Sequence, residues 1–259
     1  MKKAKSLIII LATTILAAGA FSLRDRLTGS VRQMRGGETV GTRLEQYGEL
    51  VRQRLLPSFE AAKVQYPPER IALVGLKQEK VLEVWGGGAN GPLQAVRTYA
   101  ILGASGRLGP KLREGDGQIP EGLYRIESLN PNSRFHLALR LSYPNAFDKA
   151  QAKLDGRNNL GGDIMIHGSN VSIGCLAMGD RAAEELFVVA AETGLENISV
   201  ILSPVDFRRR EMPEITYALP AWTKALYRQI ALELAELTSD GTASLSGPAP
   251  LVGHPGGRQ

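Results

Sequence analysis

The spacing of hydrophobic positions along the chain changes from a helical to a strand pattern near residue 66. Between Thr42 and about Leu56, apolar side chains recur at the three- to four-residue spacing of a helix with one packed face. Pro57 is expected to start or kink a further helical turn, and the Tyr-Pro-Pro sequence at 66–68 to end the helical part. Residues 21–65 therefore comprise a polar linker followed by a helical segment.

Short runs rich in Val, Ile, Leu and Tyr then follow one another, separated by clusters of Gly, Pro and Asn. Few helical segments lie between these runs, so the pattern predicts an antiparallel or mixed sheet that closes on itself and not a βαβ repeat. The predicted strands are Arg70–Leu76, Lys80–Trp85, Ala95–Leu102, Leu123–Ser128, Phe135–Ser142, Asp163–His167 and Asn197–Leu202.

Two further helices are expected in the second half of the chain. Asp180 is placed to cap a helix over Arg181–Thr193, which Gly194 would end. Residues 221–237 carry apolar side chains on one helical face, and residues 239–259 lack periodicity and are typical of a disordered tail. The predicted fold class is mainly β with flanking helices, one of them after Cys175.

The N-terminus has the three parts of an export signal. Lys2, Lys3 and Lys5 precede an apolar run over residues 7–18, which ends in the small residues Ala18-Gly19-Ala20. We interpret residues 1–20 as a cleaved signal peptide, with an uncleaved membrane anchor as the alternative. Either interpretation places the rest of the chain outside the cytoplasm, in the bacterial periplasm or on the outer face of the cytoplasmic membrane.

Composition narrows the function classes. The 259 residues have a formal net charge of +5, which falls to +2 without the three lysines of the signal. This small charge gives no reason to expect nucleic acid as a partner. One cysteine excludes an internal disulfide, and three histidines leave little material for a zinc site, so we expect no metal and no cofactor.

The chain's chemistry is concentrated between residues 164 and 178. His167 ends a hydrophobic strand, and Cys175 follows eight residues later, just before a helix is expected. A strand end and the loop after it can bring the two side chains within hydrogen-bond reach, where the imidazole would take the thiol proton. The pattern indicates an acyl-transfer or hydrolytic site, and a structural cysteine beside a core histidine is the alternative.

The neighbours of this pair suggest supporting roles. The backbone carbonyl of Gly168 is our hypothesis for the group that orients the imidazole, because no acid lies nearby in sequence. The backbone amides of Gly174 and Cys175, at or near a helix start, would stabilise an oxyanion.

At these residues the sequence resembles a known family. His-Gly followed by Ser-x-Gly-Cys-x-x-Met is similar to the signature of YkuD-type L,D-transpeptidases, which act on peptidoglycan. The resemblance extends over residues 66–207 and is strongest to the YafK-like branch, through segments such as Glu114–Gly122 and Tyr143-Pro144-Asn145. It leaves residues 208–238 as a C-terminal helical extension.

The resemblance implies a β-sandwich of mixed sheets, with Cys175 as nucleophile and His167 as general base. Gly174 and Ser172 match positions that shape the nucleophile loop and its oxyanion site. The implied reaction acylates the cysteine with a peptidoglycan stem peptide at the amide of meso-diaminopimelate, a D-configured centre, and transfers the acyl group to an amine.

Two positions depart from the common motif, Ser-His-Gly-Cys-x-Arg. Ile173 stands where the family has its second histidine, and Ala177 stands where it has the arginine. These changes leave an amidase of the same site as an alternative, one that cleaves D-centre amides and for example releases a lipoprotein linked to the wall. A catalytically inactive module that binds the wall is the third hypothesis.

Three further residues are candidates for positioning the substrate. Asp116 and Glu121 lie in a predicted loop and could contact substrate amines, although a role within the turn is the alternative. His136 lies on a predicted strand and could face the site, or be a hydrogen-bonded core histidine. The sequence makes no prediction of the oligomeric state.

Overall fold

The computed structural model describes residues 37–215 and 217–239. The predicted signal at 1–20 and the predicted tail beyond 239 lie outside the described residues. Within the described residues, none of the helices combines the length and the apolar character that crossing a membrane would require. The residues from Val40 onwards form one compact unit, which contains all the helices and strands described below.

In this part of the chain, eight strands form one mixed sheet in the order β3-β2-β1-β8-β4-β5-β6-β7. Neighbouring strands are antiparallel except at β1/β8 and β6/β7, which are parallel. This confirms the predicted fold class. The strands are β1 Arg70–Leu76, β2 Val81–Gly87, β3 Gln94–Ala100, β4 Gly122–Ser133, β5 His136–Leu141, β6 Met165–His167, β7 Leu176–Ala177 and β8 Ile198–Ser203.

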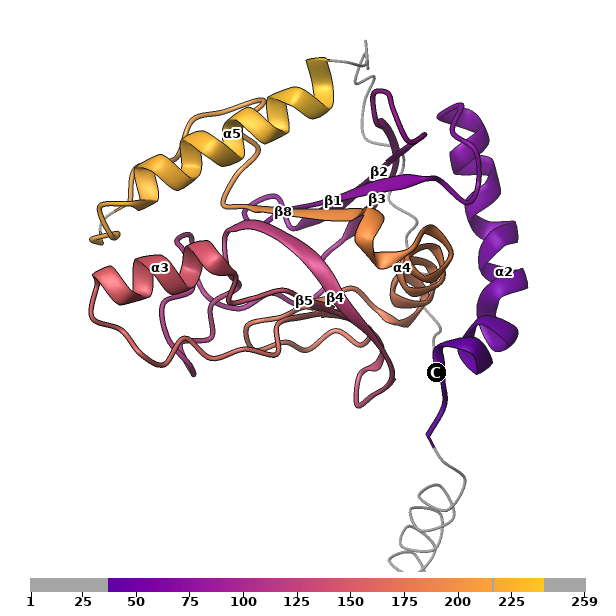
Figure 1. Ribbon diagram of the computed structural model, residues 1–259, viewed down its shortest axis with the longest axis horizontal. Coiled ribbons are helices and arrows are strands. Elements are labelled where there is room, and N and C mark those ends of the chain that lie inside the picture. The colour runs from indigo at the N-terminus through magenta and orange to yellow at the C-terminus, as the bar shows by residue number, and fades with distance from the viewer. Residues whose placement is uncertain (1–36, 216, 240–259) are drawn as a thin grey trace, which may run out of the picture. The chain divides into compact units, whose positions relative to one another are not determined.

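Helices cover both faces of the first half of the sheet. Ile71 and Leu73 of β1 join the core beneath α2 (Val40–Ala61) and α4 (Asp180–Thr193). The alternate residues Ala72 and Val74 join a second core beneath α5 (Thr223–Ser239). Figure 1 shows α5 on one side of β1 and β8 and α4 on the other. This two-sided burial explains the nearly continuous hydrophobic sequence of β1.

In the second half of the sheet, one face is buried and the other carries the candidate site. Leu137 and Leu139 of β5, Ile166 of β6 and Leu176 of β7 belong to the core that includes α4. Because side chains alternate along a strand, the residues between them lie on the opposite face. There the covering is made by loops instead of a helix, and this leaves room for a substrate.

Some local expectations are wrong. The structure adds α3 (Ala146–Leu154), which begins at a capping box formed by Asn145 and Asp148. Cys175 is followed by the short strand β7, so helix α4 begins only at Asp180. The N-cap of α4 is Gly179, and the carboxylate of Asp180 instead accepts the backbone N–H of Ser169, 2.7 Å away. Pro57 lies inside α2.

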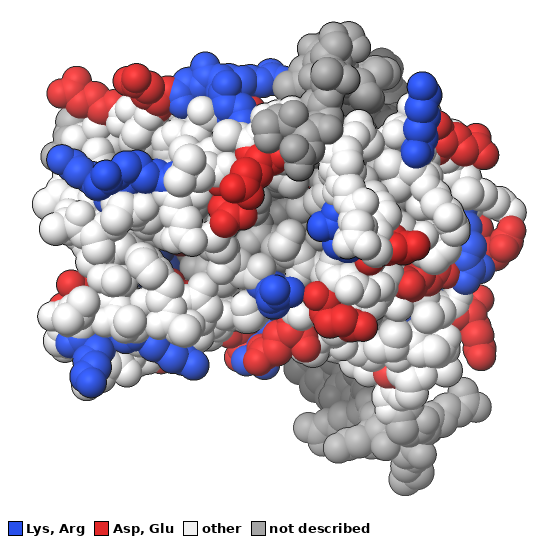
Figure 2. Space-filling view, turned by 45° about the horizontal axis from the view of Figure 1, so that its top comes forward, with Lys and Arg blue, Asp and Glu red and all other residues white. Residues whose placement is uncertain are grey.

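Charged side chains are distributed over the surface without a large region of one sign. Figure 2 shows Lys and Arg side chains interspersed with Asp and Glu side chains on the visible face. Several of these charges join α2 to α4, including Arg54 and Glu184, whose side-chain atoms lie 2.9 Å apart. The helix that precedes the first strand is thereby tied to the helix that follows the candidate site.

A buried ionic network connects α5 to the loop between β3 and β4. The carboxylate of Glu121 is inaccessible to solvent and lies 2.8 Å from the Lys77 ammonium. It also accepts hydrogen bonds from the backbone N–H of Gly109, at 2.8 Å, and from the Tyr227 hydroxyl of α5, at 2.6 Å. Since an unpaired buried charge is strongly destabilising, each partner is needed by the others.

We predict that Tyr227→Phe lowers the free energy of unfolding by about 1–3 kcal/mol, because it leaves one oxygen of the buried Glu121 carboxylate without its donor. Urea unfolding followed by circular dichroism measures the change. Tyr47→Phe is the matched control, because the described residues give the Tyr47 hydroxyl no hydrogen-bond partner. Equal unfolding midpoints for the two variants would contradict the prediction.

Candidate active site

The short parallel ladder between β6 and β7 positions Cys175. Ile166 pairs with Leu176, and His167 pairs with Ala177. Because Ile166 and Leu176 point into the core, Cys175 and His167 lie on the other face of the sheet. They are diagonal neighbours across the ladder, a separation that side chains can bridge.

The Cys175 thiol is partly buried and has two backbone neighbours. The Met165 N–H lies 3.4 Å from Sγ and points towards it, and the thiol donates to the carbonyl oxygen of Asp163, 3.6 Å away. Burial raises the pKa of the Cys175 thiol, and the Asp163 charge acts in the same direction. The Met165 hydrogen bond and the Lys111 charge oppose this rise in pKa. The resting thiol is therefore protonated at neutral pH.

The imidazole of His167 is held in one tautomer. Its Nδ1 lies 2.6 Å from the carbonyl oxygen of Gly168, and a carbonyl can only accept, so Nδ1 carries the proton. Nε2 is then the unprotonated nitrogen. The ring stacks on Phe135, with 4.8 Å between ring centroids, and only 2% of the residue is exposed. Burial lowers the pKa of His167, so the resting imidazole is neutral.

Gly168 occupies a position that no side chain could share. A Cβ atom there would lie 2.6 Å from a carboxylate oxygen of Asp180 and 2.7 Å from the backbone oxygen of Phe135. Such contacts are too short for any non-glycine residue, so the close approach of these segments requires glycine. The same packing fixes the direction of the Gly168 carbonyl towards His167.

The expectation of an oxyanion site at a helix start is wrong in this structure. Helix α4 begins five residues after Cys175, and both predicted amides are already bonded to serine hydroxyls. The Cys175 N–H donates to Ser172 Oγ at 2.9 Å, and Ser172 Oγ donates to the Cys175 carbonyl at 2.6 Å. The Gly174 N–H donates to Ser105 Oγ at 2.6 Å. A substrate oxygen would have to replace a serine hydroxyl as acceptor.

Asp116 organises the loop beside the nucleophile and does not face a substrate. Its carboxylate accepts the Lys111 ammonium at 2.6 Å and three backbone N–H groups at 2.9 to 3.0 Å. The loop lies against Gly174, where a Cβ atom would be 3.3 Å from the Gln118 carbonyl oxygen. The alternative of a role within the turn therefore describes Asp116 better than a contact with substrate amines.

The other two positioning candidates lie away from the thiol. Glu121 is buried in the network with Lys77 and Tyr227, so it cannot contact substrate. His136 Nε2 lies 3.2 Å from Glu184 of α4, and its ring contacts that of Tyr47 of α2 edge-on. His136 thus joins the two helices, which matches the alternative of a hydrogen-bonded core histidine.

Sequence reasoning missed Ser105, Asp163 and Phe135. Ser105 lies in a glycine-rich segment interpreted as a turn, and it meets Gly174 across 69 positions of sequence. Asp163 appeared only as the first residue of a predicted strand, yet its carbonyl is the acceptor for the thiol. No local signal marks these residues, because their roles arise from the packing of three loops.

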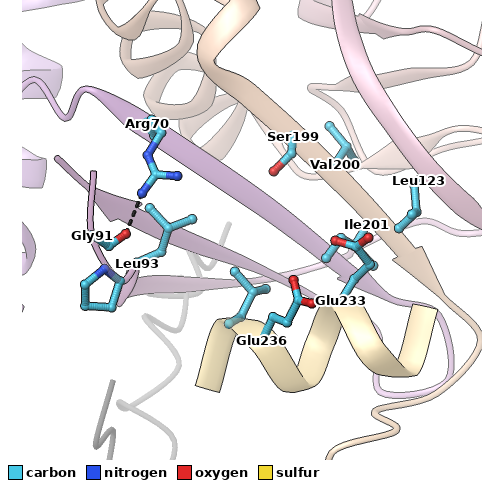
Figure 3. A pocket seen from close by; sticks show the side chains of 11 residues that line it. Arg70, Gly91, Leu93, Leu123, Ser199, Val200, Ile201, Glu233 and Glu236 are labelled. Atoms are coloured by element: carbon cyan, nitrogen blue, oxygen red, sulfur yellow. Dashed lines mark hydrogen bonds between the residues drawn. The ribbon is translucent and has the colours of Figure 1, made fainter. Parts of the chain in front are cut away.

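One hollow of about 210 Å³ lies elsewhere, between the sheet and the end of α5. Figure 3 shows Glu233 and Glu236 of α5 directed towards Leu123 and Ile201 of the sheet. None of the predicted site residues lines it. Among the described residues, no three His, Cys, Asp or Glu side chains gather as metal ligands.

Comparison with known proteins supplies the family context. The model of the YkuD family, described as the L,D-transpeptidase catalytic domain, matches residues 69–200. YafK of Escherichia coli K12, named as a candidate L,D-transpeptidase, is 42% identical over 96 residues. That segment covers 36% of this chain and 37% of YafK, so little more than a third of this curated relative is matched.

Solved structures with weaker similarity include two cell-wall proteins. The helical cell shape determining protein Pgp2 from Campylobacter jejuni is 23% identical, with a TM-score of 0.43 over 64% of this chain and 53% of Pgp2. L,D-transpeptidase 1 from Mycobacterium tuberculosis is 18% identical, with a TM-score of 0.31 over 52% of this chain and 62% of that protein.

We predict that the native Cys175 thiol is alkylated by iodoacetamide with a midpoint above that of the unfolded chain, where a thiol titrates near about 8.5. Asp163→Asn should move the native midpoint down, because it removes a negative charge that raises the thiol pKa. Intact mass measured against pH follows the reaction, since the chain has one cysteine.

Glu60→Gln, on the exposed side of α2, is the control for the loss of a charge. A native midpoint at or below that of the unfolded chain would show that the thiol is not held in its neutral form.

Proposed function

The chain belongs to the YkuD family of L,D-transpeptidase catalytic domains, and from this premise we propose that it is an exported, cysteine-dependent peptidoglycan L,D-transpeptidase. Cys175 would be acylated by a stem peptide at the amide of meso-diaminopimelate and would transfer the acyl group to an amine. Its place of action would be the periplasm or the outer face of the cytoplasmic membrane, as the N-terminal sequence indicates.

The geometry of Cys175 and His167 is the observation that carries this proposal. The chain's single thiol lies on the same sheet face as an imidazole whose Nε2 is unprotonated. In this structure the thiol donates to Asp163 and not to the imidazole. Rotation about the Cys175 side-chain bond would redirect the S–H towards Nε2, because the two residues are diagonal neighbours.

The pKa directions define how the proton would move. Thiol and imidazole are both neutral at rest, so the thiolate would form only as it attacks the substrate carbonyl. His167 Nε2 would take the thiol proton, a C–S bond would form, and the amide C–N bond would break. The imidazolium would return its proton to the leaving amine of D-alanine, leaving a thioester on Cys175.

The second half of the reaction would repeat these steps with an incoming nucleophile. An acceptor amine would lose its proton to His167 while its nitrogen attacks the thioester carbonyl. The C–S bond would then break, and the imidazolium would reprotonate the sulfur. Water in place of the amine would complete a hydrolysis by the same steps, so the acceptor alone separates transfer from hydrolysis.

The serine-bonded amides suggest how the oxyanion would be stabilised. The Gly174 and Cys175 N–H groups donate to Ser105 and Ser172 in this structure. A developing oxyanion is a stronger acceptor than a hydroxyl, so it would compete for these donors as negative charge forms. The exchange would favour the transition state over the bound substrate.

We predict that the purified protein removes D-alanine from tetrapeptide muropeptides and that Cys175→Ser abolishes this turnover. His167→Gln should lower kcat about 10²- to 10⁴-fold, the range for loss of a general base. His136→Gln is the matched control and should retain activity, because His136 contacts Glu184 away from the thiol.

Mass spectrometry of the products identifies the acceptor. An added amine indicates transfer, and a gain of water indicates hydrolysis. If no stem loses D-alanine and no amide is cut or formed, or if Cys175→Ser is fully active, the proposal is wrong and a wall-binding role is favoured.

A pH profile tests the assignment of His167. Because burial lowers its pKa below 6.5, the base form persists to lower pH, and the acid limb of kcat/KM should have its midpoint below pH 6.5. The residual activity of His167→Gln should lack this limb. A limb that persists in the variant would indicate another group, such as Asp148, whose pKa burial raises to about 6.

A further inference from the structure

Three charged side chains form a cluster beside the nucleophile, which we call the rim triad: Arg140, Glu127 and Asp163. Arg140 Nη1 lies 3.0 Å from Asp163 Oδ1, and Arg140 Nε lies 3.1 Å from Glu127 Oε2. All three are accessible, with side-chain exposures of 40% for Arg140, 57% for Glu127 and 73% for Asp163. None of them has a role in the chemistry assigned to Cys175 and His167.

Strand register places the rim triad on the same face as the nucleophile. Arg140 of β5 pairs with Met165 of β6, so both side chains lie on one face of the sheet. Cys175 continues this row, because it directly precedes the pair formed by Ile166 and Leu176. A bulge in β4 at Glu127 brings that side chain to Arg140 as well.

Asp163 joins the rim triad to the thiol directly. Its backbone carbonyl accepts the thiol hydrogen at 3.6 Å, while its carboxylate pairs with Arg140. Two strand spacings of about 4.8 Å separate the backbones at Arg140 and Cys175. A substrate chain about 8 Å long, starting at the thioester carbon, would end among these three side chains.

The charges of the rim triad are complementary to an amino-acid head group. One guanidinium and two carboxylates together carry a net charge of −1, which suits neither a lone carboxylate nor an apolar chain. A carbon that bears both an ammonium and a carboxylate would satisfy both signs at once. The Arg140 Nε–H is buried and makes no hydrogen bond despite its short distance to Glu127, so the guanidinium has donating capacity left for a ligand.

We infer that the rim triad binds the distal amino-acid end of the diaminopimelate side chain of the acyl donor; this rests on the proposed function. Arg140 would bind the distal carboxylate, and Glu127 and Asp163 would bind the distal ammonium. The reach fits, because the six carbon–carbon bonds from the acyl carbon to the distal carboxyl carbon span about 8 Å when extended. Exposed ion pairs contribute little to stability, so the substrate can compete with them at small cost.

This assignment gives the chain a carboxylate contact although Ala177 replaces the arginine of the common motif. The guanidinium comes from β5, two strands away from the nucleophile, and not from the residue two positions after it. Recognition would then depend on sheet register and not on the local motif.

Steady-state kinetics on matched stem peptides tests the inference. The substrates are the diaminopimelate tetrapeptide, the same peptide amidated at the distal carboxyl, and the same peptide acetylated at the distal amine. Arg140→Gln should raise KM for the unmodified peptide about tenfold while kcat changes little, because the contact is remote from the reacting bond. On the amidated peptide, the variant and the wild type should have equal kcat/KM.

Glu127→Gln tests the ammonium half of the site. It should weaken kcat/KM for the unmodified peptide but not for the acetylated one. Arg125→Gln is the control for loss of a guanidinium, because Arg125 donates to the Glu196 carbonyl on β4 and lies outside the rim triad. Thermal unfolding checks that all variants are folded.

The outcomes separate the two proposals. Wild-type turnover that Arg140→Gln lowers equally on the unmodified and amidated peptides, or leaves unchanged on both, overturns the inference and leaves the proposed function standing. The absence of wild-type turnover on all three peptides overturns both.

Discussion

The burial of Ile166 and Leu176 in one core is the constraint on which the candidate site depends. These two residues pair across a parallel ladder only two residues long, and both point towards α4. Strand alternation then leaves no choice for their neighbours, so Cys175 and His167 face the opposite side of the sheet. The hydrophobic effect therefore orients the reactive pair, although neither reactive side chain contributes to that core.

The same burial determines the protonation of the pair at rest. Each group has lost enough water to disfavour its charged form, which raises the thiol pKa and lowers the imidazole pKa. An imidazole locked by the Gly168 carbonyl has one free nitrogen, and this nitrogen is in its basic form near neutral pH. Such a site resists unwanted oxidation or alkylation, because the reactive thiolate forms only when a substrate is present.

The loops around the thiol depend on a framework that lies farther away. Asp116 and Lys111 hold the loop that lies against Gly174, and the buried Glu121 carboxylate ties the same loop to Lys77 and α5. A loop with few apolar contacts would otherwise have low local stability. Buried ion pairs are poor contributors to net stability, but they permit one loop conformation, which a site with close backbone approaches requires.

The sequence by itself determined the class of fold, the strands and the identity of the reactive residues. Periodicity is a local property, and a single thiol next to a recognisable motif leaves one candidate, Cys175. Only the tertiary structure decided how Glu121 and His136 are used, because their partners come from distant segments. It also placed Arg140 in a row with Cys175, since sheet register is set by the burial of alternate residues on strands that are far apart in sequence.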